Sequence, residues 1–277
     1  EEKEVTAFFS AIASFSAFSE QVDAKKLVQL INDYLSEMTD ILTEEGGTLD
    51  KYIGDAIVGF FGAPVMIEHH AYHACISAQR MQLKQAELRE KWKKEGWPDI
   101  VSNMRTRIGL NTGLMVTGNM GSSTRFNYTM MGDNVNLAAR CESGAKTYGV
   151  YTMVTEATKT AAESVGNRLL FRYLDNIVVM GRKQPVRIYE IMCFREDVTQ
   201  EMTELIGLFQ QGIDAYLQQH WDAAISKFEI TAQLEPLRPD MPGVKTNPSE
   251  MYIDRCRSMK ELPEIEAWDG VFRMQSK

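Results

Sequence analysis

Residues 49–62 place two side chains that can do chemistry next to each other in a predicted hairpin. Lys51 and Asp55 lie four residues apart, Gly54 comes directly before the carboxylate, and an apolar run follows. A tight turn that leads into a buried strand would therefore carry both an ammonium and a carboxylate. A buried strand has little use for either charge, because an unpaired charge is costly to remove from water. Two explanations remain open. Lys51 and Asp55 are either solvated charges on a hairpin or part of a functional site.

Two further segments carry residue types that suit phosphate chemistry. Backbone N–H groups at the start of a helix can hold phosphate oxygens, and the turn after the first predicted strand offers such groups. Its residues are Ile12, Ala13, Ser14, Phe15 and Ser16. A hairpin interrupted by glycines follows at residues 105–121, and residues 126–140 come next. In that last segment Asn136 and Arg140 are four residues apart, so they share one face of a predicted helix.

Hydrophobic periodicity predicts the elements that would position these residues, all within residues 1–195. Apolar residues spaced three and four apart indicate helices, and alternating or continuous short apolar runs indicate strands. The predicted strands are 4–12, the pair around 49–62, 104–111 continued by 113–118, 125–131, 150–155, 171–180 and 186–192; the predicted helices are 23–43, 69–94, 133–148 and 156–164. Helices interleaved with hairpins are typical of an α+β domain with a mostly antiparallel sheet.

Residues 196–277 form a predicted helical extension. Residues 200–235 resemble one tetratricopeptide-type helix pair, and a last helix is predicted near 249–261, before an irregular end that carries Trp268 and Phe272. A single repeat cannot bury its own apolar face. We therefore expect the extension to dock on the main domain or on a partner.

Composition narrows the class of protein. The chain is 44% hydrophobic with a formal net charge of −8, which argues against a nucleic-acid-binding surface. Its four cysteines are scattered and match neither a disulfide framework nor a zinc site, so we expect a reducing, cytoplasmic environment. Because no methionine begins the chain, we also expect an upstream sensor domain or membrane segment in the whole protein.

Taken together, these segments resemble the catalytic domain of the class III adenylyl and guanylyl cyclases. The resemblance covers about residues 4–193 and has four parts in order: the first strand, Lys51 to Asp55, the glycine hairpin, and Gly132-Asp133 with Val135-Asn136 and Arg140. It implies a ferredoxin-like domain that pairs head to tail as a homodimer. The active site would then lie at the dimer interface.

The resemblance implies a role for each matching residue. Asp55 would bind two divalent ions, Mg²⁺ or Mn²⁺, with the backbone carbonyl of Ile12 as a further ligand, since hard cations prefer oxygen. The ribose 3′-hydroxyl would attack the α-phosphorus in line and expel pyrophosphate. Asn136 would orient the ribose, and Arg140 would stabilise charge on the reacting phosphate.

The choice of base would depend on Lys51 and Thr129. In the family, lysine at the first position donates to adenine N1, and aspartate or threonine at the second accepts from the exocyclic amine. Guanylyl cyclases carry glutamate and cysteine instead. The resemblance therefore implies ATP as the substrate and places the chain near the class IIIb branch.

Two positions depart from the family pattern. The first metal aspartate should follow Phe9 and Ser10, where this chain has Ala11. A methyl group cannot bind a metal, so we expect weak metal binding and slow turnover. The intact flanking pattern favours an engineered aspartate-to-alanine replacement over natural loss. In addition, Met180 stands where the family has a triphosphate-binding lysine, a role that Arg182 or Lys183 would have to take.

The sequence leaves several functions open. The first is an adenylate cyclase, slowed in this chain by Ala11. The second is a catalytically silent domain that keeps the dimer and the ATP pocket. A guanylate cyclase is a further alternative, and the helical extension would also suit an interaction module of the kind that follows cyclase domains in bacterial sensor proteins.

Overall fold

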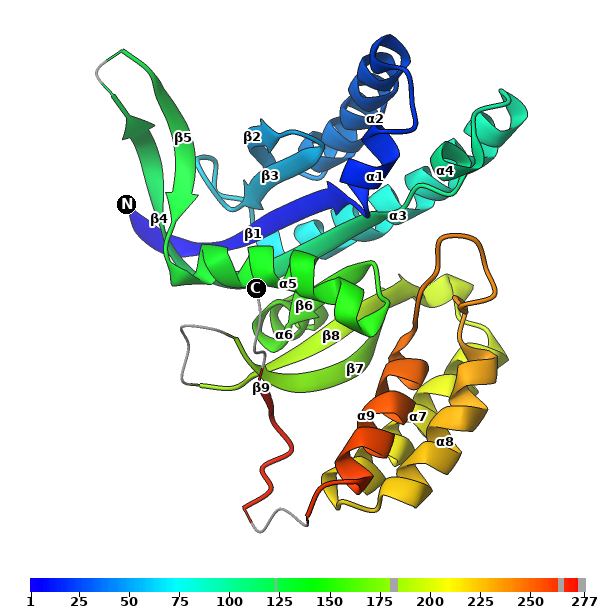
Figure 1. Cartoon of the computed structure of the whole chain (residues 1–277). Helices are drawn as coiled ribbons and strands as arrows, with labels where there is room; N and C mark the ends of the chain where they lie inside the picture. The colour runs from blue at the N-terminus through cyan, green and yellow to red at the C-terminus, as the bar shows by residue number, and fades with distance from the viewer. Residues whose placement is uncertain (123, 180–183, 264–266, 274–277) are drawn as a thin grey trace.

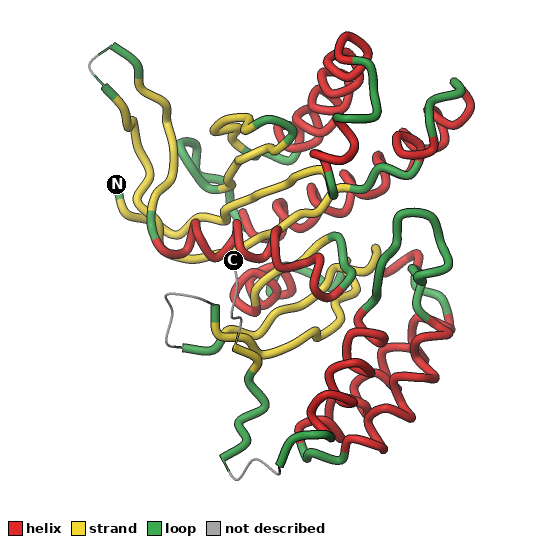
Figure 2. Tube along the Cα trace, in the orientation of Figure 1, coloured by secondary structure: helices red, strands yellow, loops and turns green. Residues whose placement is uncertain are grey.

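One large sheet organises the chain. The computed structural model describes residues 1–122, 124–179, 184–263 and 267–273, and in these residues helices cover both faces of the sheet (Figures 1 and 2). The strands are β1 (Glu2–Ile12), β2 (Thr48–Ile53), β3 (Ala56–Phe61), β4 (Thr106–Gly121), β5 (Phe126–Met131), β6 (Thr152–Thr155), β7 (Leu169–Val178), β8 (Val186–Phe194) and β9 (Phe272–Arg273). The predicted strands are confirmed, except that the two pieces expected at 104–118 are one long strand, β4.

The order of the strands puts β1 and β4 at the centre of the sheet. Within the described residues the order is β2-β3-β1-β4-β6-β8-β7-β9, and β5 pairs with the outer part of β4. Among the strands of the described residues, β4 with β6 and β7 with β9 run parallel, and the other pairs are antiparallel. The predicted α+β class with a mostly antiparallel sheet is therefore confirmed.

Alternating residues of β1 supply two separate cores. Phe8 and Ile12 face a core shared with α2 (Ala24–Glu44) and α3 (His70–Lys94). Val5 and Ala7 face the opposite side, where Ala138 packs against them. The other helices of the main domain are α1 (Phe15–Ser19), α4 (Asp99–Ser102), α5 (Asp133–Tyr148) and α6 (Glu156–Glu163). Because successive strand residues point to opposite faces, Ala11 lies on the same side as α5.

Gly109 allows α5 to lie directly on β4. A Cβ atom at this position would come within 2.1 Å of the Glu142 backbone nitrogen and 2.4 Å of the Ala138 carbonyl oxygen. No side chain fits into that space, so any larger residue would push the helix off the sheet. The glycine thus fixes the helix that carries Asn136 and Arg140.

The C-terminal extension packs on the outer part of the sheet. Helices α7 (Gln200–Leu217), α8 (Trp221–Leu234) and α9 (Pro248–Lys260) share a core, and Tyr173 of β7 packs against it. Figure 1 shows the three helices beside β7 and β8. The expected docking is therefore on the main domain. The end of the chain is not wholly irregular, because β9 joins β7.

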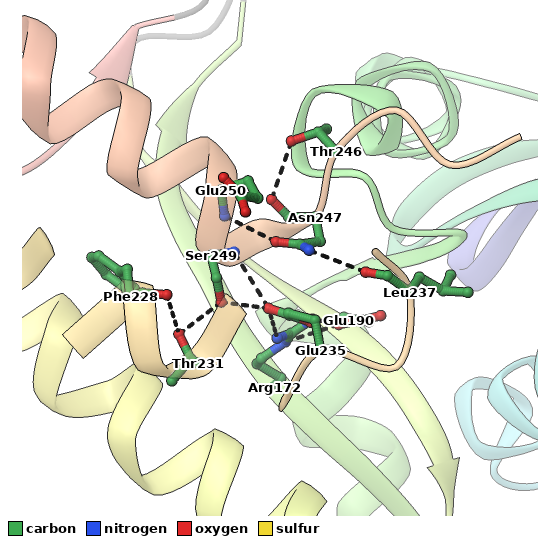
Figure 3. Close-up of polar contacts among 10 residues, drawn as sticks. All are labelled: Arg172, Glu190, Phe228, Thr231, Glu235, Leu237, Thr246, Asn247, Ser249 and Glu250. Carbon is green, nitrogen blue, oxygen red and sulfur yellow. Dashed lines mark hydrogen bonds and ion pairs between the residues drawn. The ribbon is translucent and has the colours of Figure 1, made fainter. Parts of the chain in front are cut away.

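Buried ion pairs join the extension to the sheet. Arg172 of β7 donates to Glu190 of β8 at 2.5 Å and to Glu235, just after α8, at 2.8 Å (Figure 3). The side chains of Arg172 and Glu235 are each only 2% exposed. A second pair links Arg255 of α9 to Asp175 at 2.6 Å. None of the described helices is long and apolar enough to cross a membrane.

Candidate active site

The end of β1 and the β2–β3 turn form the first cluster of predicted site residues. The Asp55 carboxylate Oδ2 accepts a hydrogen bond of 2.6 Å from the Ile12 backbone N–H. Ala11 comes directly before, and it pairs across the sheet with Arg107 of β4. The structure therefore brings Ala11, Ile12 and Asp55 together, as the resemblance implied.

Charged groups surround Asp55. Burial raises the pKa of its carboxyl, and the Ile12 N–H and the Arg107 guanidinium offset part of that rise. Arg107 Nε also donates to Glu142 of α5 at 3.1 Å. Burial raises the pKa of Glu142 as well, with Arg107 opposing and Asp55 adding to the rise. Arg107 thus pairs with Glu142 and acts on Asp55 through its charge, and the sequence alone indicated no role for Arg107 or Glu142.

These donors do not complete a site for two metal ions. Asp55 and the Ile12 carbonyl are oxygen donors suited to Mg²⁺ or Mn²⁺, but position 11 supplies a methyl group. In the described part of the chain, no three His, Cys, Asp or Glu side chains are grouped so as to hold a metal. Position 11 is thus where this chain differs from the pair of metal-binding aspartates that the resemblance implied.

The turn after β1 has some of its N–H groups already bonded. Ala13 N–H donates to the Arg105 carbonyl at 2.8 Å, and Ile12 N–H is bonded to Asp55. Ser14 has a left-handed backbone (φ 59°) and comes just before α1. The first N–H groups of a helix have no acceptor within the helix. Five residues of this turn were predicted to contact phosphate. Of these, Ser14, Phe15 and Ser16 are the ones whose backbone N–H groups remain available to a ligand.

Asp50 joins the two predicted base-selecting residues. Thr129 Oγ1 donates a short hydrogen bond to one oxygen of the Asp50 carboxylate, and Lys51 Nζ lies 3.4 Å from the other. The Asp50 side chain is 2% exposed, whereas that of Lys51 is 41% exposed. A buried carboxylate therefore holds a hydroxyl and an ammonium from different strands at one place.

A bulge in β2 makes this arrangement possible. The pairing of β2 with β3 shifts register between Leu49 and Lys51. In a regular strand, neighbouring residues point to opposite faces, so Asp50 and Lys51 would be separated. A bulge inserts an extra residue and changes the direction of the side chains. Strand alternation therefore gave no signal for Asp50, although it directly precedes Lys51.

Asn136 and Arg140 lie on α5, and their side chains form no hydrogen bond or ion pair with the residues of either cluster. Asn136 is exposed and Arg140 half-buried, on one side of α5 as predicted. Within the described residues, neither side chain has a hydrogen bond or an ion pair. Arg182 and Lys183, and Met180 with them, lie outside the described residues.

Comparison of the sequence with models of protein families assigns the chain to a family. The model of the adenylate and guanylate cyclase catalytic domain matches residues 1–193. The chain belongs to this family. Class III cyclases of this kind generally use divalent metal ions, act on nucleotides and commonly form dimers.

Curated relatives of this cyclase domain include adenylate cyclases from distant organisms. The terminal-differentiation-specific adenylate cyclase of Dictyostelium discoideum is 30% identical over 268 residues, which are 95% of this chain and 12% of that protein. Adenylate cyclase 1 of Rhizobium meliloti is 30% identical over 190 residues, or 69% of this chain and 28% of that protein. The chain thus spans less than a third of either relative. The Dictyostelium match also extends into the helical extension.

Solved structures of both kinds of cyclase share the fold. The adenylyl cyclase CyaB from P. aeruginosa is 33% identical, with a TM-score of 0.64 over 72% of this chain and 98% of its own. The guanylyl cyclase Cya2 is 31% identical, with a TM-score of 0.61 over 72% of this chain and 96% of its own. These values establish the class III cyclase fold. The similarity is nearly equal for the adenylyl and the guanylyl cyclase, so the choice between adenine and guanine depends on the residues of the site.

Proposed function

We propose that this cyclase domain converts ATP to 3′,5′-cyclic AMP and pyrophosphate in a homodimer, and that Ala11 slows it. The observation that carries the choice of ATP is the group formed by Lys51, Asp50 and Thr129. The 3′-hydroxyl of the ribose would attack the α-phosphorus in line, with pyrophosphate as the leaving group. Asn136 would orient the ribose, and Arg140 would stabilise the charge that develops on the phosphate.

Asp50 gives both base-selecting groups the polarity that adenine needs. Because the Thr129 hydroxyl donates its hydrogen to Asp50, the lone pairs of its oxygen remain to accept from the adenine amino group. Lys51 is held beside the same carboxylate and can only donate, which suits adenine N1. Guanine has the opposite polarity at both positions, so each contact would leave a polar group unpaired.

Removing the Asp50 carboxylate should weaken this selection. In a chain that also carries Ala11→Asp, Asp50→Ala is expected to lower the ratio of kcat/KM for ATP over GTP by about tenfold, because the Thr129 hydroxyl becomes free to rotate. The ratio is measured with both nucleotides under the same metal concentration. The double variant Lys51→Glu and Thr129→Cys is the matched comparison: it should reverse the preference, so that kcat/KM is higher for GTP than for ATP. An unchanged ratio in Asp50→Ala would refute the role given to Asp50.

Exposed apolar side chains support the dimer. They lie on the β2–β3 turn and on the β4–β5 ribbon, which extends from the sheet in Figure 1. Ile53, Leu114, Phe126 and Met131 are 60%, 59%, 62% and 59% exposed. Exposed apolar groups of this kind are typical of protein interfaces. Asn136 and Arg140, whose side chains have no hydrogen-bond or ion-pair partner among the described residues, would then serve the site whose Asp55 belongs to the other protomer.

Mixing two inactive variants tests this shared site. In the Ala11→Asp background, Asp55→Ala and Arg140→Ala should each lose about a hundredfold or more of the activity. Mixed after unfolding and refolding together, half of the dimers contain one chain of each kind. Each mixed dimer has one site with both defects and one intact site, so about a quarter of the parent activity should return. If differently tagged chains copurify as mixed dimers and no activity returns, the sites are not shared.

A silent nucleotide-binding domain is the second candidate function, and Ala11 is the observation that favours it. The chain keeps Lys51, Thr129, Asn136 and Arg140 but has Ala11 at the position of the family's first metal aspartate. Binding of ATP by the chain as it stands, without turnover even after Ala11→Asp, would support this function over the cyclase.

A further inference from the structure

A cavity lies where the catalytic domain meets the helical extension. Its volume is about 220 Å³, and its lining includes Arg89 of α3, Arg105 just before β4 and Tyr151 just before β6. Leu237 and Asn247, from the connection between α8 and α9, line its other side. The cavity is thus shared by the two parts of the chain.

Two arginines line this cavity without a carboxylate partner. Within the described residues, neither Arg89 nor Arg105 forms an ion pair or a side-chain hydrogen bond. The Arg105 guanidinium instead lies over the Tyr151 ring, 5.4 Å from its centroid, and its Nε atom is buried without a hydrogen-bond partner. Arg172, which lines the same cavity, differs because it contacts Glu190 and Glu235. The cavity therefore has three arginines and two glutamates, and both glutamates are already paired.

The surroundings of Arg89 disfavour its positive charge. Burial, together with the nearby positive charge of Arg105, lowers the pKa of Arg89 to about 10. An arginine in water has a pKa above 12. The charged form of Arg89 is therefore less favourable here than in water, and a negative charge in the cavity would offset part of that penalty.

We propose that this cavity binds a small free oxyanion of the phosphate class between Arg89 and Arg105. The guanidinium group presents a planar fork of donors that fits two oxygens of such an anion. The volume of about 220 Å³ is below the roughly 300–1,000 Å³ of pockets that hold drug-sized ligands, which favours a small anion over a nucleotide. This proposal does not depend on the proposed cyclase activity.

The cavity extends from a residue bonded to the turn after β1 to the connection between α8 and α9. The Arg105 carbonyl accepts the Ala13 N–H at 2.8 Å, which ties Arg105 to the predicted phosphate-contacting turn. On the other side of the cavity, Asn247 Nδ2 donates to the Leu237 carbonyl at 3.1 Å, as Figure 3 shows. An anion held by the two arginines would therefore lie next to this connection between α8 and α9.

Calorimetric titration of the full chain with inorganic phosphate tests the proposal. At constant ionic strength, with chloride as the replaced salt, saturable binding of one phosphate per chain and a rise in Tm are expected. Arg89→Gln and Arg105→Gln should each weaken that binding about tenfold or more. Lys93→Gln is the matched control: it removes one positive charge from the same helix, outside the cavity, and should leave the affinity unchanged.

Two results would overturn the proposal. One is the absence of saturable phosphate binding, and the other is binding that both arginine variants leave unchanged, which would place the phosphate at another site. Arg89 is half-buried at the edge of α3, so Arg89→Gln carries the test if Arg105→Gln does not fold. The titration measures no catalysis, so a negative result leaves the cyclase proposal intact.

Discussion

Replacing Ala11 by aspartate is expected to raise Mn²⁺-dependent formation of cyclic AMP from ATP by about a hundredfold or more. Ala11 lies directly before Ile12, whose N–H binds Asp55, and across the sheet from Arg107. A carboxylate at position 11 would therefore stand beside Asp55 and supply the oxygen donor that the site lacks. Calorimetry with Mn²⁺ should show tighter metal binding in the same variant, independently of turnover.

Ala11→Asn separates the carboxylate from the size of the side chain. Asparagine has the shape of aspartate but carries no charge, so it should restore little of the activity and little of the metal affinity. Two results would contradict our account of Ala11. One is turnover of the unchanged chain at the rate of the Ala11→Asp variant, and the other is full recovery with asparagine.

The surroundings of Asp55 give a physical reason to expect weak metal binding in the unchanged chain. One of its oxygens accepts the Ile12 N–H, and Arg107 lies close enough to offset part of the rise in its pKa. Arg107 also places a positive charge opposite position 11. With aspartate at position 11 that charge would have a further carboxylate partner besides Glu142 and Asp55, whereas with alanine it opposes a cation at the site.

The sequence predicted the elements of the catalytic domain well because their hydrophobic patterns are strong. The spacing of Asn136 and Arg140 was enough to place them on one side of α5. The group around Asp50 was not predictable in the same way. It requires a bulge in β2 that brings Asp50 and Lys51 to the same place, and a contact with Thr129, 79 residues further along the chain.

In the helical extension, too, contacts between residues far apart in the sequence could not be predicted. The apolar residues Tyr216 and Phe228 predicted a helix pair that needs a further surface to cover it, and α9 and Tyr173 supply that surface. The polar part of the junction gave no such signal. Arg172 and Glu235 are 63 residues apart, and each taken alone has the composition of an exposed charge. Burial of the pair becomes visible only when the sheet and the helices are assembled.

Glu235→Ala is expected to destabilise the whole chain by about 3–5 kcal/mol, since it leaves the buried Arg172 without one of its two carboxylates. For a chain of this size, that loss should lower Tm by roughly 10 °C. Thermal unfolding followed by circular dichroism measures the change. Glu229→Ala is the matched control on the exposed side of α8, where the contact with Arg257 at 3.5 Å should contribute about 1 kcal/mol or less.

The unfolding profile of Glu235→Ala also distinguishes an integral extension from an attached interaction module. If the extension folds with the sheet, the variant should unfold in one transition at the lower temperature, because Arg172 lies in β7. An attached module would instead give two transitions, with the catalytic domain unfolding at its original temperature. Glu235 also binds the Ser249 N–H and hydroxyl at the start of α9, so its loss loosens the extension internally as well. A Tm within 2 °C of the parent, equal to that of Glu229→Ala, would show that the buried pair contributes no more than a surface contact.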